Sequence, residues 1–322
     1  MLDTVKDSDA LVLAAWLYHV RGLSQQEVGQ SLGLSRFQVN RMLAEAREAG
    51  IVRITVEHET TAALALADAL RQRWELAEVL VAPLPAPLEA DADYARRAVG
   101  LVAARFLHRV GSDGPSAIGV GWGRTVAAMA EALSGLRNRD LCFVSLMGSL
   151  VRTSATSPFD VCARLAALTG GQALFLPAPF LADSAADRAV ILRQRLVRET
   201  LAAARKVDHA IISVGECTPD ALLFASGVLT AEDGRALRAA GAVADTTGMF
   251  FQADGSLADT DLNRRAPSVG LDDLRACEVS LLAAGCSKAT AVRAALQAGF
   301  VDRLIVDERL GRMLAAAPEG SP

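Results

Sequence analysis

Short apolar segments alternate with helical segments from about residue 75 onward, and this rhythm restricts the fold more than any other feature. The segments are nearly continuous aliphatic runs, which is typical of strands that are buried on both faces. Parallel strands need helical crossovers, so the pattern predicts an α/β fold with a Rossmann-like sheet covered by helices. The expected strands are Glu78–Val81, Ala117–Val120, Leu141–Leu146, Ala173–Leu176, His209–Val214, Val279–Ala283 and Arg303–Val306.

Helices are expected between these strands, and one more helical stretch, Thr60–Trp74, precedes the first of them. That stretch is predicted to link two domains. We therefore expect an N-terminal domain over 1–58, a helical linker over 59–76 and a larger α/β domain over 77–318. The helices expected in the larger domain are Asp93–Arg109, Thr125–Leu133, Asp160–Thr169, Asp187–Arg205, Glu232–Ala240, Ala289–Gln297 and Glu308–Ala315.

The first sixty residues follow a different plan. Residues 9–20 are apolar nearly all round, Ser24 opens a second helix in a capping box with Glu27, and Ser35 caps a third helix after a glycine turn. The β-branched stretch 51–59 is typical of one strand of a wing or of the start of a linker. This order of elements predicts a winged-helix-like helix-turn-helix.

The third helix of such a unit places polar side chains in the major groove of DNA. Arginine pairs with guanine, and asparagine or glutamine with adenine, while the start of the second helix can grip a phosphate. A three-helix subdomain with solvated polar faces is the alternative. The side chains expected to contact DNA are Gln25, Ser35, Arg36, Gln38, Asn40 and Arg41.

The charge balance excludes a chain that coats nucleic acid over its whole surface. Lys and Arg total 33 against 37 Asp and Glu, a formal net charge of −4. A small DNA-reading unit on an acidic body remains compatible with this value. The sequence contains only three lysines, Lys6, Lys206 and Lys288, so a lysine in a loop is notable.

Other residue classes point to a soluble cytoplasmic protein without cofactor or metal. The five cysteines form no CxxC pair and the four histidines are scattered, so we expect no metal site. The acidic N-terminal segment does not resemble a signal peptide. The apolar stretch Ala10–Val20 is too short to cross a bilayer, so no membrane partner is expected.

Ligands of open α/β sheets bind beyond the carboxyl ends of the strands, and four loops there are marked. A glycine-rich turn leads from strand to helix and suits a phosphate or polyol hydroxyls, or is simply a tight turn. The second loop, after the strand expected over Leu141–Leu146, consists of small residues. These residues leave room for a ligand, or they simply form a turn. Asp245 ends a third loop. Its carboxylate is expected to accept hydrogen bonds from sugar hydroxyls, and an exposed turn aspartate is the alternative. The first two loops contain Gly121, Trp122, Gly123, Arg124, Thr125, Gly148 and Ser149.

Lys288 marks the fourth loop, where a helix begins. A cation at that end opposes the helix dipole unless an anion stands between them. The conflict predicts a phosphate or carboxylate ligand, with a solvated surface lysine as the alternative. Cys286 lies beside it, and a reactive thiol there is not expected, because no histidine is adjacent.

Motifs at both ends of the chain resemble the SorC family of bacterial sugar-responsive transcriptional regulators. The N-terminal segment SQQEVGQSLGLSRFQVNRMLAEAREAGIVRI resembles that family's helix-turn-helix. The motifs GVGWGRT, SLMGSL, GAVADTTGMFF, AAGCSKATAVRAAL and LIVDERLG follow in the family's order. The stretch SLMGSLVRTSATSPFDV is similar to the branch concerned with polyols and small sugars.

The resemblance implies a sensor domain with the fold of sugar-phosphate isomerases, in a tetramer whose paired dimers bind operators. It implies that the two glycine-containing loops line the effector site, that Asp245 holds sugar hydroxyls and that Lys288 holds a phosphate. Ala244, Ala284 and Met147 depart from the family pattern and predict a narrower or less polar pocket. Phe37 and Asn40 are less usual in the recognition helix.

Together these features predict a regulator of a carbohydrate or polyol catabolic operon. Its expected partners are operator DNA, a small sugar, polyol or sugar phosphate as effector, and further copies of itself. The competing hypothesis is a sugar-phosphate isomerase or deaminase with an N-terminal interaction domain. Such an enzyme needs a general base, and Asp245 is the only carboxylate inside a marked loop, so we expect no catalytic residues.

Overall fold

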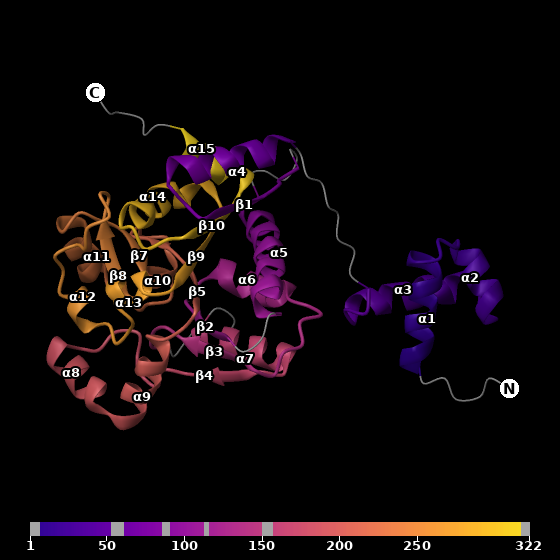
Figure 1. Cartoon of the computed structure of the whole chain (residues 1–322), viewed down its shortest axis with the longest axis horizontal. Helices are drawn as coiled ribbons and strands as arrows, with labels where there is room; N and C mark the ends of the chain where they lie inside the picture. Colours follow the sequence, from indigo (N-terminus) through magenta and orange to yellow (C-terminus); the bar gives the residue numbers. More distant parts are fainter. Residues whose placement is uncertain (1–6, 53–60, 86–90, 113–115, 150–156, 317–322) are drawn as a thin grey trace. The chain divides into compact units, whose positions relative to one another are not determined.

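The computed structural model describes residues 7–52, 61–85, 91–112, 116–149 and 157–316. The chain divides into two compact units, Met1–His58 and Glu59–Pro322. Figure 1 labels the elements of both units.

The smaller unit is a three-helix bundle with the geometry of a helix-turn-helix. It consists of α1 (Asp7–His19), α2 (Gln25–Leu32) and α3 (Arg36–Glu48). The capping boxes at Ser24 and Ser35 are formed, and Gly33 ends α2 in the left-handed conformation that glycine adopts without strain. The three helices enclose a small core of Ala14, Ala15, Val28, Val39, Leu43 and Ala46. The expected strand over 51–59 begins with two residues that are not in a strand, and 53–59 lie outside the described residues.

The larger unit is built on a seven-stranded sheet in which every neighbouring pair is parallel. The strand order is β1-β10-β9-β5-β2-β3-β4. This confirms the predicted α/β fold, and the expected strands are displaced by at most two residues at their ends. The strands are β1 (Glu78–Ala82), β2 (Ser116–Val120), β3 (Leu141–Ser145), β4 (Gln172–Leu174), β5 (His209–Ser213), β9 (Glu278–Ala283) and β10 (Arg303–Asp307).

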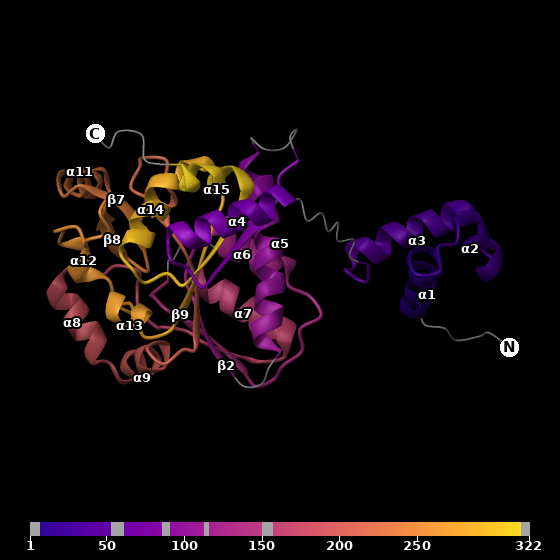
Figure 2. The ribbon, with the colours of Figure 1, turned by 45° about the horizontal axis from the view of Figure 1, so that its top comes forward.

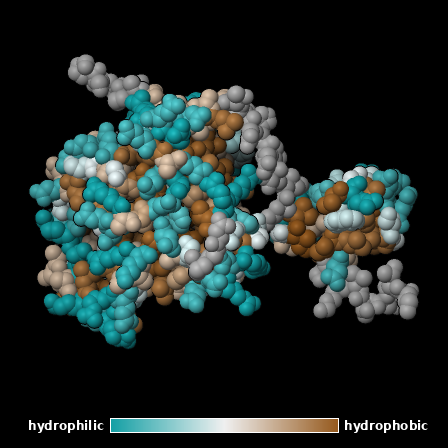
Figure 3. All heavy atoms as spheres, viewed as in Figure 1, coloured by the Kyte–Doolittle hydropathy of each residue, from teal (hydrophilic) through white to brown (hydrophobic). Residues whose placement is uncertain are grey.

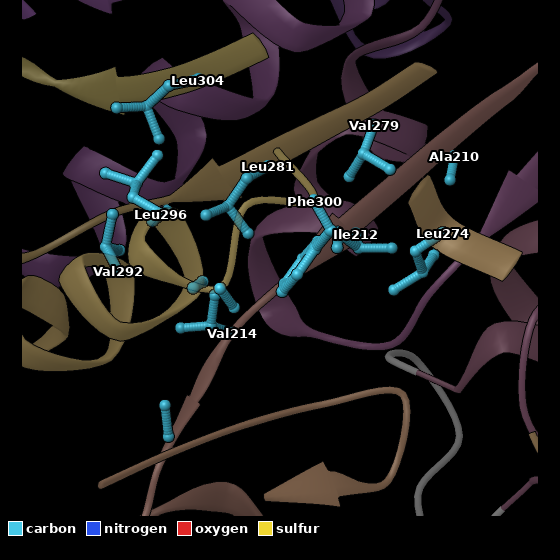
Figure 4. Packing of buried hydrophobic residues seen from close by; sticks show 14 of the residues in the cluster. Ala210, Ile212, Val214, Leu274, Val279, Leu281, Val292, Leu296, Phe300 and Leu304 are labelled. Atoms are coloured by element: carbon cyan, nitrogen blue, oxygen red, sulfur yellow. The ribbon is translucent and has the colours of Figure 1, made fainter. Parts of the chain in front are cut away.

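Both faces of the sheet are buried, because successive side chains of a strand enter different cores. On β5, Ile211 belongs to one hydrophobic cluster, whereas Ala210 and Ile212 belong to another. Figure 4 shows part of the second cluster around Leu281 and Phe300. This explains why the strands are nearly continuous apolar runs.

Two different groups of helices cover the two faces (Figure 2). One cluster includes residues of α5 (Ala92–Gly111), α6 (Arg124–Ala132) and α7 (Pro158–Thr169). The other includes residues of α4 (Thr61–Arg73), α9 (Arg195–Ala204), α13 (Leu271–Arg275), α14 (Ala289–Gln297) and α15 (Glu308–Ala315).

The stretch expected to be a linker is an integral part of the larger unit. Leu70 of α4 is fully buried in the same cluster as Leu310 and Leu314 of α15, and Arg73 donates a hydrogen bond of 3.0 Å to the carbonyl of Ala315. The apolar face of α4 is thus covered by the C-terminal helix. The helical part of the stretch expected to be a linker over 59–76 thus belongs to the larger unit.

Two further expectations need correction. The helix expected over 187–205 is two helices, α8 (Ala185–Arg193) and α9, because Gln194 between them is extended. The loop that ends at Asp245 is largely strand β7 (Ala242–Thr246), which pairs with β6 (Gly215–Glu216) and β8 (Met249–Gln252) in a separate antiparallel sheet. The remaining short helices are α10 (Leu222–Ala225), α11 (Ala231–Ala239), α12 (Leu262–Arg265) and the 3-10 turn η2 (Cys286–Lys288).

Candidate functional site: a pocket at the sheet edge and a recognition helix

The order in which the chain adds strands to the sheet reverses between β2 and β5, which are neighbours. From β2 the chain continues to β3 and β4 on one side, whereas from β5 it continues to β9 and β10 on the other. The loops that leave two such strands diverge, so a crevice opens at their carboxyl ends. A pocket lies at this position, and Trp122, Gly123, Val214 and Gly215 line it from the loops that follow β2 and β5.

The small antiparallel sheet and the loop before α14 complete the walls of the pocket. The polar or charged residues that line it are Arg96, Arg124, Thr125, Ser213, Asp245, Thr246, Thr247 and Lys288, and the apolar ones include Met147, Leu222, Leu223, Leu282 and Ala284. The pocket holds about 630 Å³ of empty space, part of it open to solvent. Apolar walls with a few convergent polar groups are typical of small-molecule sites.

Short hydrogen bonds join the three elements that meet at the pocket floor. Ser213 at the end of β5 donates to the carbonyl of Trp122 at 2.6 Å, and Thr246 of β7 donates to the carbonyl of Ser213 at 2.9 Å. A Cβ on Gly123 would lie 2.0 Å from the Ser213 hydroxyl oxygen. This close approach, together with a φ of 142°, requires glycine at position 123.

Asp245 is buried under the pocket. Burial raises the pKa of its carboxyl to about 7, the nearby Glu216 carboxylate adds to this effect, and Lys288 opposes it. A Cβ on Gly215 would lie 1.9 Å from Oδ1 of Asp245, so the carboxyl occupies the space that a side chain at position 215 would fill. Asp245 is therefore a buried group that titrates near neutrality, and the exposed-turn alternative is wrong.

Lys288 is paired with a carboxylate of the chain itself. Its ammonium donates to Oε2 of Glu216 and, at 2.9 Å, to the carbonyl of Val214, while Ser287 donates to Oε1 of Glu216 at 2.8 Å. Burial raises the pKa of the Glu216 carboxyl, but Lys288 and these hydrogen bonds outweigh it and hold that pKa below its usual value. The side chains of Lys288 and Glu216 are both mostly buried.

The Glu216–Lys288 ion pair explains why a cation is tolerated at the start of this helix. The anion expected beside Lys288 is the carboxylate of Glu216, a residue that the sequence pattern did not mark. Lys288 is neither a solvated surface lysine nor an unpaired cation. Glu216 and Val214 engage two of the three N–H donors of this ammonium, so a phosphate that binds to Lys288 either shares the ammonium with Glu216 or replaces it.

Thr247 is the most unusual residue of the pocket. The residue is only 2% exposed, and its hydroxyl has no hydrogen-bond partner among the residues that the structure describes. Its backbone has a φ of 50°, a conformation that β-branched residues rarely adopt. An unsatisfied buried hydroxyl costs about 1–3 kcal/mol and positive-φ strain a further 1–3 kcal/mol, and such costs cluster at functional sites.

Six of the nine sequence-predicted effector residues line the pocket together: Trp122, Gly123, Arg124, Thr125, Asp245 and Lys288. The other three do not line it. A Cβ on Gly121 would contact Ile212, and one on Gly148 would lie 2.1 Å from the carbonyl of Pro179, so both glycines permit close backbone contacts. Ser149 pairs with Pro179 through its backbone.

Sequence reasoning missed Ser213, Gly215, Glu216 and Thr247. The pair Gly215–Glu216 directly follows a buried strand at the switch point, and this was the available signal. Nothing in the sequence pattern marks Thr247, because its φ and its unsatisfied hydroxyl exist only in the folded chain.

The polar side chains predicted to contact DNA lie on α3 and the start of α2, and several contact one another. Gln25 donates to Oδ1 of Asn40 at 3.2 Å, and its amide oxygen lies 3.5 Å from Nε of Arg36. Oε1 of Gln38 accepts hydrogen bonds from the backbone N–H and the hydroxyl of Ser35, both at 2.9 Å. While Gln38 caps α3 in this way, its amide oxygen is not free for a bidentate contact to adenine.

Arg41 shares the exposed face of α3 with Asn40. Its guanidinium lies 3.5 Å from the carboxylate of Glu45, and both side chains are exposed. Exposed pairs of this kind contribute about 0–1 kcal/mol, so Arg41 can exchange this partner for another anion at little cost.

No group of three or more His, Cys, Asp or Glu side chains within the described ranges could hold a metal ion. Among the helices that the structure describes, none is both long and apolar enough to cross a membrane.

Comparisons with known proteins match nearly the whole chain. A family model described as "Putative sugar-binding domain" matches residues 58–315. The erythritol catabolism regulatory protein EryD of Brucella abortus is 33% identical over 97% of this chain and 98% of its own length. The deoxyribonucleoside regulator of Bacillus subtilis is 30% identical over 94% of this chain and 95% of its own length.

Solved structures share the fold. The full-length sorbitol operon regulator SorC of Klebsiella pneumoniae superposes with a TM-score of 0.72 at 22% identity, covering 96% of this chain and all of that one. A DeoR family transcriptional regulator of Listeria monocytogenes gives a TM-score of 0.73 at 23% identity, covering 79% of this chain and all of that one.

A helix-turn-helix joined to a ligand-binding α/β unit defines a ligand-responsive transcriptional regulator. With the sugar-binding domain match and full-length relatives, the chain belongs to the SorC family of sugar-binding transcriptional regulators. The relatives are regulators and not enzymes, so the isomerase alternative is not favoured.

Burial raises the pKa of the Cys286 thiol, which makes it a poor nucleophile.

Proposed function

We propose that this chain controls a sugar or polyol catabolic operon by sensing a small effector in the pocket at the β2–β5 switch point. The observation that carries the proposal is the unsatisfied hydroxyl of Thr247, buried in the same pocket as Asp245 and Lys288. A ligand hydroxyl that bonds to Thr247 removes the cost of leaving it unpaired. Trp122, Gly123, Arg124 and Thr125 line the same pocket.

We propose a small polyol or sugar as the effector. A neutral hydroxyl compound finds Asp245 and Thr247 as partners and leaves the Glu216–Lys288 pair intact. A phosphorylated compound has to share the Lys288 ammonium with the Glu216 carboxylate, which carries a like charge, or displace it, although Arg124 and the start of α6 offer a second position for the phosphate charge. The name of the erythritol catabolism regulator of Brucella abortus supports the polyol class.

We infer that α3 reads operator DNA through Arg36, Asn40 and Arg41, with Gln25 on the backbone phosphates and Ser35 and Gln38 holding the start of the helix. The chain acts as a homo-oligomer in the cytoplasm, where two or more reading units on one DNA raise the total affinity. This explains how one nearly neutral unit in a protein of net charge −4 binds DNA.

A thermal-shift panel of tetritols, pentitols, hexitols, the matching sugars and their phosphates tests the effector site. A ligand at 100 times its Kd stabilises the folded chain by about 2.7 kcal/mol, which is readily detected. A hit whose thermal shift is smaller in Thr247→Val than in the wild type supports the proposal. A hit of equal size in Thr247→Val places the ligand elsewhere.

A further inference from the structure

Phe37 is the most exposed of the large hydrophobic side chains that the structure describes. It is the second residue of α3 and is 77% exposed, and it contributes nothing to the core of the smaller unit. Figure 3 shows that apolar residues also reach the surface elsewhere on this unit, among them residues of α1. Phe37 differs from those because it lies in the first turn of the recognition helix.

Its helical position places Phe37 among the residues expected to reach base edges. Residues three and four apart share a helix face, so Phe37, Asn40 and Arg41 lie on one exposed face of α3. In helix-turn-helix proteins the N-terminal residues of this helix contact bases in the major groove. A bulky phenyl group at this position meets the groove floor together with the polar side chains.

The neighbouring polar side chains are already partly engaged. Oε1 of Gln38 accepts two hydrogen bonds from Ser35, and Oδ1 of Asn40 accepts one from Gln25. The exposed phenyl ring of Phe37 is therefore surrounded in sequence by polar side chains that already form hydrogen bonds with one another. An apolar group on such a face needs an apolar partner on the DNA.

The C5-methyl of thymine is the apolar group that base edges present in the major groove, and phenylalanine is among the side chains that contact it. We propose that Phe37 reads thymine by packing against this methyl group, so that each operator half-site carries a thymine opposite α3. The inference rests on the proposed DNA binding by α3. The arginines at positions 36 and 41 supply positive charge beside the ring, as a DNA-facing surface requires.

The test uses the full-length protein and duplexes enriched by it from a random library. Each thymine of the enriched site is replaced in turn by deoxyuridine, which removes only the methyl group and keeps the base pair. At one or two positions per half-site, wild-type affinity is expected to fall about three- to tenfold. The Phe37→Ala variant is expected to lose a similar factor on the thymine duplex and nothing further on the deoxyuridine duplex.

Trp16→Ala is the matched control, because Trp16 is a half-exposed aromatic residue of α1 in the same unit. It is expected to keep the full deoxyuridine effect. The proposal is overturned if Phe37→Ala responds to deoxyuridine as strongly as the wild type. It is also overturned if Phe37→Ala changes the sedimenting mass without changing the thymine dependence, since the ring then contacts another copy of the chain.

A failure of the proposed DNA binding by α3 gives a different result from a failure of the Phe37 proposal. If the wild-type protein enriches no duplex, with or without hits from the effector panel, DNA reading by α3 is itself wrong. If it enriches duplexes in which no deoxyuridine substitution matters, only the role of Phe37 is wrong. Circular dichroism of Phe37→Ala checks that α3 is intact, which is expected because the ring packs against no core residue.

Discussion

Two adjacent threonines in the pocket differ in their hydrogen bonding. The hydroxyl of Thr246 donates to the carbonyl of Ser213, whereas that of Thr247 has no partner in the described part of the chain. The first is explained by the fold alone, because it ties β7 to β5. For the second we propose a ligand hydroxyl as the partner, since burial without a partner is unfavourable.

Replacing Thr247 by valine keeps the branched shape and removes the hydroxyl. We expect effector affinity to fall about three- to tenfold, the value of one hydrogen bond, while thermal stability stays the same or rises. Thr246→Val is the control and should lose about 1 kcal/mol of stability because a hydrogen bond inside the fold is broken. Calorimetric titration and thermal unfolding measure the two effects. A Thr247→Val variant that is less stable than the wild type would contradict the proposal that this hydroxyl is unpaired in the absence of a ligand.

Asp245 makes stability depend on pH. Its pKa is about 7 in the folded chain against an ordinary value of 3.8, so the folded state holds a proton that the unfolded state has released. The resulting stabilisation is present at low pH and is lost as the pH rises through about 7. Asp245→Asn should lack this component, so its unfolding midpoint in urea should fall less than that of the wild type between pH 5 and 8. Equal slopes would show that Asp245 is ionised throughout.

At the scale of elements, the sequence predicted the helices and strands that are marked by local sequence signals and missed those that are not. The seven strands of the parallel sheet and the capped helices of the helix-turn-helix follow from apolar runs and from serine caps, which are local signals. The small antiparallel sheet was missed because β6 has two residues and β7 resembles a turn with its Gly241. The break at Gln194 has neither glycine nor proline to mark it.

The candidate site was predictable where a loop follows a strand of the main sheet. The turn after β2 and Lys288 were found in this way. Glu216 was not, because the sequence does not show that β6 brings its carboxylate to an ammonium 72 residues further on. The consequence is practical: removing Lys288 alone leaves Glu216 buried without a counter-charge, which is costly.

The first element-scale prediction concerns Gly215 of β6. An alanine Cβ there would lie 1.9 Å from Oδ1 of Asp245, so the carboxyl has to leave its place. Gly215→Ala should abolish the thermal shift by the effector and destabilise the fold. Gly270→Ala, whose Cβ would meet nothing closer than 3.7 Å, should do neither. Unchanged effector binding in Gly215→Ala would remove Asp245 from the site.

The second concerns α4. Because Leu70 is fully buried beside α15, Leu70→Ala should cost the larger unit about 2–5 kcal/mol. A fragment that begins at Glu59 should therefore fold cooperatively, and one that begins at Ala77 should not. Thermal unfolding followed by circular dichroism compares the two. Equal transitions would show that α4 is only a linker.

At the scale of the whole molecule, regulation requires that the effector bind the DNA-competent and DNA-incompetent states with different affinity. The pocket connects three elements of the larger unit through Ser213, Trp122 and Thr246, so a ligand there affects all three. The oligomer that we propose places several reading units under the control of such pockets. Sedimentation equilibrium of the wild type should give the mass of a dimer or a tetramer, and a strictly monomeric chain would contradict this.

The most direct test of the central claim is the affinity of the full-length protein for its enriched duplex with and without the effector found in the thermal-shift panel. We expect a change of about 5- to 150-fold in the wild type, which corresponds to a coupling of about 1–3 kcal/mol. Thr247→Val should need more effector for the same change, and its affinity for DNA alone should equal that of the wild type. An affinity for DNA that a saturating, pocket-bound effector leaves unchanged would contradict the account.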